Sequence, residues 1–409
     1  IEYCIVDIET FKTNNSPIKL NYSSHNLKNC ISIQPHSLLF ETSIKQQEIN
    51  IHWIHKIPYF FKTSETRYFN YDILASTFFV VSRYEEYLPT DLDVHKRFKA
   101  ENSIAFKNNF LEIPIVNLWA LELKKEILKN ELNFYFPKLK YNFINSIDID
   151  IAYAYKGKGK VRLIGSSLKA VFTFNFKELK NRINFFTKRN KDPYDSYNFI
   201  HRLQKQYKTK NIYFFQLGDY GKFDKNLSHK SKELKKLIKT LVKKNTIGIH
   251  PSYASNYNKD KISIEIERLQ KISNKKISNS RQHYLILKFP HTYEQLINCN
   301  IEHDYTMGYA TQIGFRAGIC TTYPFFNIIK NEERKLLITP FQIMDGSLNQ
   351  YLNLSPIKAI EKITKLVDIT KKNNGTFVSI WHNSTLSECY EWKQWSKVYE
   401  KLIKIAKDS

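Results

Sequence analysis

Hydrophobic and polar residues change their rhythm along this chain of 409 residues. Up to about residue 140, short alternating runs accompany one segment, Tyr71 to Tyr87, whose apolar residues repeat at helical spacing. From Tyr141 onward, short β-rich runs alternate with longer helical patterns, which is typical of βα units around a parallel sheet or barrel. No Pro-rich or Gly-rich linker separates the two parts. We therefore expect two parts that pack together.

The second part contains the most clearly patterned elements. Strands are predicted at 142–148, 211–216, 246–250, 335–341 and 376–382, and helices at 195–207, 230–243, 259–272 and 356–371. No internal repeat at a fixed period interrupts this order. The pattern predicts a mixed α/β domain.

Composition excludes several classes of protein. The hydrophobic content of 42%, with 14% aromatic residues, is too high for a disordered chain, and 11 Gly with 12 Pro exclude a collagen-like chain. No apolar run approaches the length of a membrane span, and the first residues show no basic leader before an apolar core. The five cysteines form no CxxC pair, which favours a reducing compartment. The expected location is the cytoplasm.

The positive charge of the chain is concentrated in one region. The formal net charge is +24, and residues 151–280 contain 30 Lys and Arg against 9 Asp and Glu, which accounts for +21. Most of these lysines fit the solvated faces of amphipathic helices. Nucleic-acid binding would need stackable aromatic residues among them, and the tyrosines present fit core positions equally well, so it is not favoured. An acidic or lipid-linked substrate is left open.

Polar residues follow several predicted strands. In βα architectures, reactive groups lie where strands end at the carboxyl edge of the sheet. Such positions here are occupied by Asp148, Asp150, His250, Arg316 (in a glycine-flanked loop), Asp345 and His382. Singly, an Asp-x-Asp pair is often a helix cap or turn, and a lone His is often a core residue. Together, Asp and His with an open position compose a catalytic mononuclear metal site.

The order of these strings resembles the polysaccharide deacetylase superfamily, carbohydrate esterase family four, in a divergent bacterial branch. The strings are Asp-x-Asp-x-Ala-Tyr from Asp148, His-Pro-Ser-Tyr from His250, Arg-Gln-His-Tyr-Leu from Arg281, Gly-Phe-Arg-Ala-Gly around Arg316, and Trp-His-Asn around His382. The resemblance implies a distorted (β/α) barrel deacetylase domain over residues 141–409. Residues 1–140 resemble the smaller α+β accessory domain of that branch, through Phe78–Tyr87 and Asp93–Phe98.

The resemblance also implies an activity: a metal-dependent hydrolase that removes an N-acetyl or other acyl group from an amino sugar of a polysaccharide, oligosaccharide or glycan precursor. Asp148 is expected to be the base that deprotonates the attacking water, and His382 the acid that protonates the leaving amine. Arg316 is expected to orient the base carboxylate, and Asp345 to be a further orienting carboxylate. The metal is expected to be zinc, with cobalt or nickel as alternatives, bound by Asp150 and His250.

One position departs from the family pattern. The second ligand histidine is expected four residues after His250, but Ala254 stands there. We predict that His283 replaces it and restores a set of two His and one Asp. The alternative is a glycan-binding protein of the same fold without catalytic activity. The segments 158–191 and 219–230 are expected to be loops that shape the groove.

Overall fold

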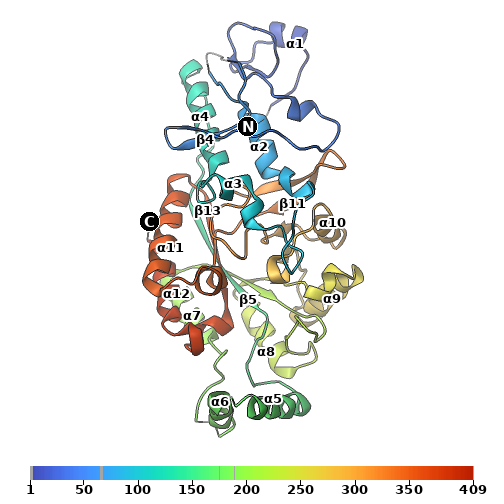
Figure 1. Ribbon diagram of the computed structural model, residues 1–409, viewed down its shortest axis with the longest axis vertical. Coiled ribbons are helices and arrows are strands. Elements are labelled where there is room, and N and C mark those ends of the chain that lie inside the picture. The colour runs from blue at the N-terminus through green and yellow to red at the C-terminus, as the bar shows by residue number, and fades with distance from the viewer. Residues whose placement is uncertain (1–2, 65–67, 132, 175, 188, 409) are drawn as a thin grey trace.

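The structure is a computed structural model that describes the chain except residues 1–2, 65–67, 132, 175, 188 and 409, and except the side chains of 160–163, 166, 169, 177 and 178. Figure 1 shows the N-terminal residues at one end, a large sheet with its helices in the middle, and two helices, α5 and α6, at the opposite end. The carboxyl-terminal helix lies beside the sheet. The sheet therefore connects the two ends of the molecule.

The described part of the chain forms helices of very different lengths and mostly short strands. The helices are α1 (Ile8–Thr13), α2 (Ile73–Val81), α3 (Ile104–Lys107), α4 (Ile115–Asn130), α5 (Lys160–Phe172), α6 (Phe176–Phe186), α7 (Tyr197–Tyr207), α8 (Lys232–Leu241), α9 (Asp260–Ser273), α10 (His291–Asn298), α11 (Pro356–Lys372) and α12 (Trp395–Lys407). The strands are β1 (Leu20–Asn21), β2 (Ile31–Ser32), β3 (His52–Ile54), β4 (Ile57–Tyr59), β5 (Asn142–Ile149), β6 (Lys210–Phe215), β7 (Thr246–Ile249), β8 (Asn279–Ser280), β9 (His303–Asp304), β10 (Tyr323–Asn327), β11 (Glu332–Ile338), β12 (Ile343–Met344) and β13 (Thr376–His382). Within the described residues, no helix is both long enough and apolar enough to cross a membrane.

Nine strands form one sheet, in the order β10-β11-β9-β8-β7-β6-β5-β13-β12. Only the β10–β11 pair is antiparallel, and the other neighbours are parallel. Four of the predicted strands are confirmed to within about one residue as β5, β6, β7 and β13, and the mixed α/β class is confirmed. The strand predicted at 335–341 is β11, which begins and ends three residues earlier. The observed order ends at β10 and β12, which are not paired with each other. Closure of the sheet into a barrel therefore stays a prediction.

Helices pack against the sheet, with α7, α11 and α12 at the left of the view in Figure 1 and α8, α9 and α10 toward its right. Helix α11 shows why these segments are helical. The side chain of Ser355 caps its first turn, and Pro356 occupies the first helical position, where no amide hydrogen bond is lost. Its buried residues recur at helical intervals and face the sheet: Ala359, Ile363, Leu366, Val367 and Thr370.

The expectation of a loop at 158–191 is wrong, because α5 and α6 occupy most of that segment. Ile164, Leu168 and Val171 are spaced by four and three residues, which places them on one face of a helix. The abundant Lys and Asn residues obscured this pattern in the sequence. The second segment, 219–230, contains no helix or strand, as expected.

A buried ion-pair network joins the N-terminal part to the second part. Arg83, which ends the helical segment with a left-handed backbone (φ 59°), donates to Glu86 at 2.7 Å. Arg316 donates to both oxygens of the same carboxylate, at 2.9 Å and 2.6 Å. Arg83 also binds the carbonyl oxygen of Arg316. The exposed side-chain fractions of these residues are only 2% to 3%, so the network is sealed from water. Each charge is tolerable only because the others are present.

This network predicts a large loss of stability in Glu86→Gln. The substitution keeps the volume but leaves the buried guanidinium of Arg316 without a carboxylate and that of Arg83 with Glu85 alone. Both guanidinium groups hold the pKa of Glu86 low against the effect of burial. We expect the free energy of unfolding in urea to fall by about 3–5 kcal/mol. Glu9→Gln, which removes an exposed ion pair with Lys12, is the matched control and should change little. A loss in Glu86→Gln as small as in the control would contradict the assigned role.

Candidate metal centre and active site

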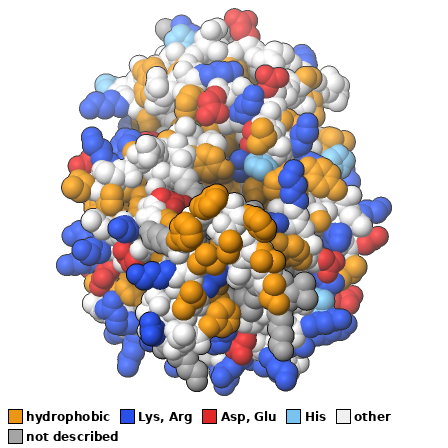
Figure 2. Space-filling model, turned by 60° about the horizontal axis from the view of Figure 1, so that its bottom comes forward, with side chains coloured by type: hydrophobic (Ala, Val, Ile, Leu, Met, Phe, Trp, Pro, Cys, Tyr) orange, Lys and Arg blue, Asp and Glu red, His pale blue; other side chains and the backbone are white. Residues whose placement is uncertain are grey.

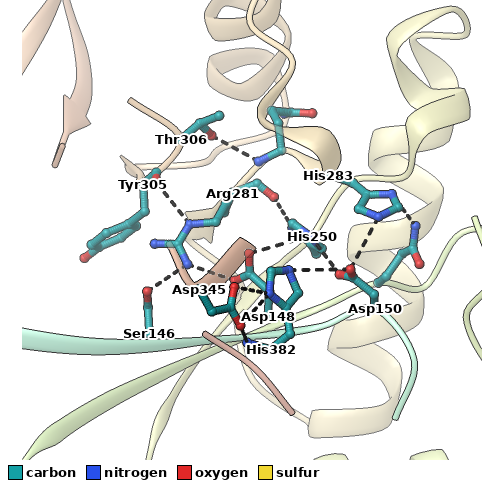
Figure 3. Close-up of polar contacts among 12 residues, drawn as sticks. Ser146, Asp148, Asp150, His250, Arg281, His283, Tyr305, Thr306, Asp345 and His382 are labelled. Atoms are coloured by element: carbon teal, nitrogen blue, oxygen red, sulfur yellow. Dashed lines mark hydrogen bonds and ion pairs between the residues drawn. The ribbon is translucent and has the colours of Figure 1, made fainter. Parts of the chain in front are cut away.

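Polar side chains converge at the carboxyl ends of the parallel strands, as Figure 3 shows. Asp148 near the end of β5 lies opposite His382, the last residue of β13. The connections after β7, β8 and β12 add His250, His283 and Asp345. Because parallel strands end at the same edge of the sheet, residues more than two hundred positions apart meet in one site.

Three residues at this edge of the sheet could bind a metal ion: Asp150, which directly follows β5, and His250 and His283. One ligand atom from each lies within 4.8 Å of the others. Asp150 Oδ1 is 3.1 Å from His250 Nε2, and Asp150 Oδ2 is 3.6 Å from His283 Nε2. Asp150 Oδ1 is buried and has no geometrically acceptable hydrogen-bond donor. A carboxylate whose two oxygens each face an imidazole nitrogen is the donor set of a zinc-like ion, so the residues fit the predicted metal.

The orientation of His250 leaves its Nε2 free for a metal. Its Nδ1 is 2.6 Å from the carbonyl oxygen of Arg281. A carbonyl can only accept a hydrogen bond, so Nδ1 carries a proton, and in the neutral imidazole the lone pair is then on Nε2. The imidazole is only 2% exposed, so its tautomer is set by this bond rather than by water.

A buried carboxylate orients His283 in the same way. Its Nδ1 donates to Asp224 Oδ1 at 3.0 Å, and Gln216 donates to the same oxygen at 2.6 Å. The other oxygen of Asp224 accepts the backbone N–H of Ala254 at 3.2 Å. Ala254 occupies the position where the family pattern expects the second histidine. Its backbone N–H thus supports Asp224, the carboxylate that orients His283. A carboxylate bonded to the far nitrogen of a ligand histidine is a common support in metal sites.

The electrostatics of the group favour a cation. Although burial opposes ionisation, His283 and His382 hold the pKa of Asp150 well below its usual range. Burial favours a neutral His283, but the carboxylates of Asp150 and Asp224 outweigh it and raise the pKa of His283 to about 9. Without a metal, a proton on His283 therefore supplies the positive charge that the two carboxylates require.

Arg281, and not Arg316, holds the predicted base. Arg281 Nη1 donates to Asp148 Oδ1 at 2.8 Å and to Ser146 Oγ at 2.8 Å. The Arg281 side chain is fully buried, and its guanidinium lies 4.5 Å from the centre of the Phe214 ring. Asp148 Oδ2 remains on the side of His250 Nε2, at 3.8 Å.

The predicted contact between Arg316 and the base carboxylate is wrong. The guanidinium of Arg316 is used by Glu86 and by the carbonyl oxygen of Gly308. Glu86 belongs to the N-terminal part, and nothing in the sequence indicates that it contacts Arg316, a residue far from it along the chain.

Asp345 orients the predicted acid. His382 Nδ1 is 2.9 Å from Asp345 Oδ1, and Asp345 also accepts hydrogen bonds from the His382 backbone N–H and the Thr385 hydroxyl. The Nε2 of His382 faces Asp150 Oδ2 at 3.6 Å. Burial disfavours charge on the imidazole, but Asp345 and Asp150 raise the pKa of His382 to about 10. Asp345 therefore lies where an orienting carboxylate was predicted, and it acts on His382.

An aromatic wall borders the metal-ligand group. It consists of His95, Phe223, Tyr253 and Tyr284, all partly exposed. The Tyr284 ring lies 4.6 Å from the His283 ring, and the His95 ring lies 4.7 Å from that of Tyr284. Rings of Phe223 and Tyr253 are 4.2 Å apart. The N-terminal part thus contributes a side chain beside the site.

Arg97 anchors this contact. It donates to the carbonyl oxygen of Tyr284 at 2.8 Å and pairs with Asp93 at 2.6 Å. The ion pair of Arg97 with Asp93 therefore fixes a loop beside the site.

Residues 1–133 of the chain match the model of a family of unknown function, DUF7033. No curated protein matches the chain. The crystal structures that the chain resembles include the following two. One is a protein of Mycobacterium smegmatis provisionally assigned as a polysaccharide deacetylase, with 12% identity and a TM-score of 0.42, covering 67% of this chain and 87% of that one. The other is a polysaccharide deacetylase of Bacillus cereus, with 11% identity and a TM-score of 0.29, covering 65% and 86%.

Removal of any of the three metal ligands should abolish stoichiometric zinc binding. We expect Asp150→Ala, His250→Ala and His283→Ala each to lower zinc affinity by more than about 10²-fold, since two remaining ligands hold zinc poorly. Isothermal titration of the metal-stripped protein measures this loss. The control is His201→Ala, an exposed histidine on α7. Full zinc affinity in His283→Ala would disprove its role as the replacement ligand.

Zinc binding should strengthen as the pH rises. The metal needs the unprotonated Nε2 of His283, whose pKa without metal is about 9, so binding below that pH displaces a proton. The apparent affinity is expected to increase about tenfold per pH unit between pH 6 and 8 and to level off near pH 9. Asp224→Asn removes one carboxylate that raises this pKa, so its plateau should begin at lower pH. An affinity independent of pH over this range would contradict the account.

Proposed function

We propose that the protein is a metal-dependent hydrolase that removes an N-acetyl or other acyl group from an amino sugar of a polysaccharide, oligosaccharide or glycan precursor. One observation carries the proposal. Asp148 and His382, each fixed by its own charged partner, face the same metal-ligand group from neighbouring strands. A base and an acid on two sides of a metal-ligand group are the parts that hydrolysis of an amide requires.

The residues can share the proton transfers as follows. When bound, the metal would polarise the acyl carbonyl and make water more acidic. Asp148 accepts a proton from the attacking water through Oδ2, because Oδ1 is engaged by Arg281. His382 donates a proton from Nε2 to the amide nitrogen as the C–N bond breaks, while its Nδ1 stays bonded to Asp345. The products are a carboxylate and the amine of the sugar.

The acid is what makes an amide a suitable substrate. An amine leaves as a neutral molecule only if its nitrogen is protonated during cleavage. Asp345 and Asp150 favour the protonated ring of His382, so a proton is available at neutral pH. The available proton and the bond from Nδ1 to Asp345 together support a role as acid.

The aromatic wall supports a sugar as the group that carries the amine. Its partly exposed rings offer flat apolar surfaces, on which the C–H face of a pyranose can pack while its hydroxyls stay in water. Tyr284 adjoins the ligand His283, so a sugar packed there would hold its acyl group close to the metal.

Acetate release from N-acetylglucosamine oligomers, by protein loaded with zinc, cobalt or nickel, tests this function. Asp148→Asn should retain metal binding and lower kcat by about 10²–10⁴-fold, because the amide cannot act as the base. Sugar binding without any acetate release by the wild-type protein would favour the alternative, a glycan-binding protein of the same fold.

The role of His382 can be separated from that of Asp148 by the leaving group. His382→Ala should lower kcat for the N-acetyl amide by about 10²-fold or more, but should affect hydrolysis of 4-nitrophenyl acetate far less, since nitrophenolate leaves without a proton. Asp148→Asn serves as the control because it should impair both substrates. Equal losses for the two substrates in His382→Ala would contradict the assigned acid.

A further inference from the structure

The hairpin of α5 and α6 exposes a cluster of large apolar side chains. It stands at the end of the molecule opposite the N-terminal residues (Figure 1). The cluster consists of Ile164, Leu168, Val171, Phe172, Phe174, Phe176, Ile183 and Phe186, with exposed fractions from 49% for Val171 to 79% for Phe172. Figure 2 shows hydrophobic side chains gathered on the face that this end presents, with Lys and Arg around them. An apolar cluster of this kind on a surface marks a site of interaction.

The two helices form a unit that is attached firmly to the catalytic edge of the sheet. Arg182 of α6 donates to Ser167 of α5 at 3.0 Å, which joins the helices. The carboxylate of Asp192, after the hairpin, accepts the backbone N–H groups of residues 154, 155 and 156, before it, at 2.8 Å to 2.9 Å. This clamp closes the base of the hairpin only a few residues after Asp150.

A second tie links the base of the hairpin to the strand that carries the acid. Asn383, next to His382, donates to the carbonyl oxygens of Ile151 and Tyr194 at 3.1 Å and 2.9 Å. The segments that enter and leave the hairpin are thus both bonded to the end of β13. The base of the hairpin is therefore tied to the edge of the site, so whatever the hairpin binds is held near Asp150 and His382.

The charge around the cluster identifies the kind of partner. Residues 156–191 contain eleven Lys and Arg against one Glu. Lys180, Arg189 and Lys191 are among the exposed residues of this segment. A helix pair that combines exposed Phe, Ile and Leu with many basic residues suits the boundary between anionic headgroups and acyl chains.

Two other partners fit less well. A second copy of the chain would bring the same positive surface against itself, and like charges oppose such a contact. A soluble acidic polymer would pair with the lysines but would leave the phenylalanines in water. A bilayer with anionic lipids satisfies both features of the surface.

We propose that the α5–α6 hairpin docks the protein on the surface of anionic lipid bilayers, with its apolar cluster inserted at the headgroup level. The helices lie on the membrane and do not cross it. Because the hairpin is clamped to the edge of the sheet, docking would hold the candidate active site next to the bilayer. The proposal is independent of the reaction catalysed there.

Co-sedimentation of the full chain with vesicles tests the proposal. Vesicles of phosphatidylcholine alone are compared with vesicles that contain about 30% phosphatidylglycerol, and binding to the latter should be at least about tenfold tighter and should weaken with salt. The triple variant Phe172→Ser, Phe174→Ser, Phe176→Ser should bind these vesicles at least about tenfold more weakly. All three side chains are more than two-thirds exposed, so the fold should be retained, as thermal unfolding can verify.

The matched control replaces exposed apolar residues elsewhere. Ile329→Ser with Ile357→Ser removes side chains that are 66% and 72% exposed, outside the hairpin, and should leave vesicle binding unchanged. The proposal is overturned if the wild-type protein does not bind anionic vesicles, or if the triple variant binds them as well as the wild type does. It is also overturned if sedimentation without lipid shows a dimer that the triple variant loses, since the cluster would then join two copies.

Discussion

Two carboxylates at the end of one strand impose the constraint on which the site depends. Asp148 and Asp150 bring negative charge to an edge of the sheet where Asp148 is almost fully buried, and buried charges must be compensated. Each of the two carboxylates has its own partners. Arg281 pairs with Asp148, whereas Asp150 faces imidazoles and keeps one oxygen without a hydrogen-bond donor. That difference divides the pair into a proton acceptor and a ligand, although the two residues are only two positions apart.

The N-terminal part completes the site from outside the sheet. Glu86 neutralises Arg316 in the second part, and Arg97 binds the backbone of Tyr284 beside the ligand His283. These contacts place the His95 ring beside Tyr284 in the aromatic wall. Buried residues of both parts belong to one continuous hydrophobic core, which holds the N-terminal part in place beside the site. A change in the N-terminal part can therefore alter the site without touching a metal ligand.

Residues that follow well-patterned strands could be predicted from the sequence, and residues positioned by tertiary contacts could not. Asp150, His250 and His382 come directly at the ends of runs whose β pattern is clear, so convergence at one edge of the sheet was a sound expectation. His283 needed the resemblance, and its support, Asp224, lies in a segment with no periodic pattern. The prediction assigned the base carboxylate to Arg316, whereas Arg281 binds it, because the sequence cannot show which carboxylate a buried arginine reaches. The helices at 160–186 were missed because abundant Lys and Asn residues hide the apolar face that Ile164, Leu168 and Val171 form.

X-ray absorption spectroscopy of the zinc-loaded protein tests the central claim most directly, because it reports which atoms surround the metal. A site built from Asp150, His250 and His283 predicts two imidazole nitrogens with the remaining ligands oxygen, at about 2.0–2.1 Å, and no sulfur. Sulfur at about 2.3 Å, or a shell of oxygen without imidazole, would show that zinc binds elsewhere and would contradict the account.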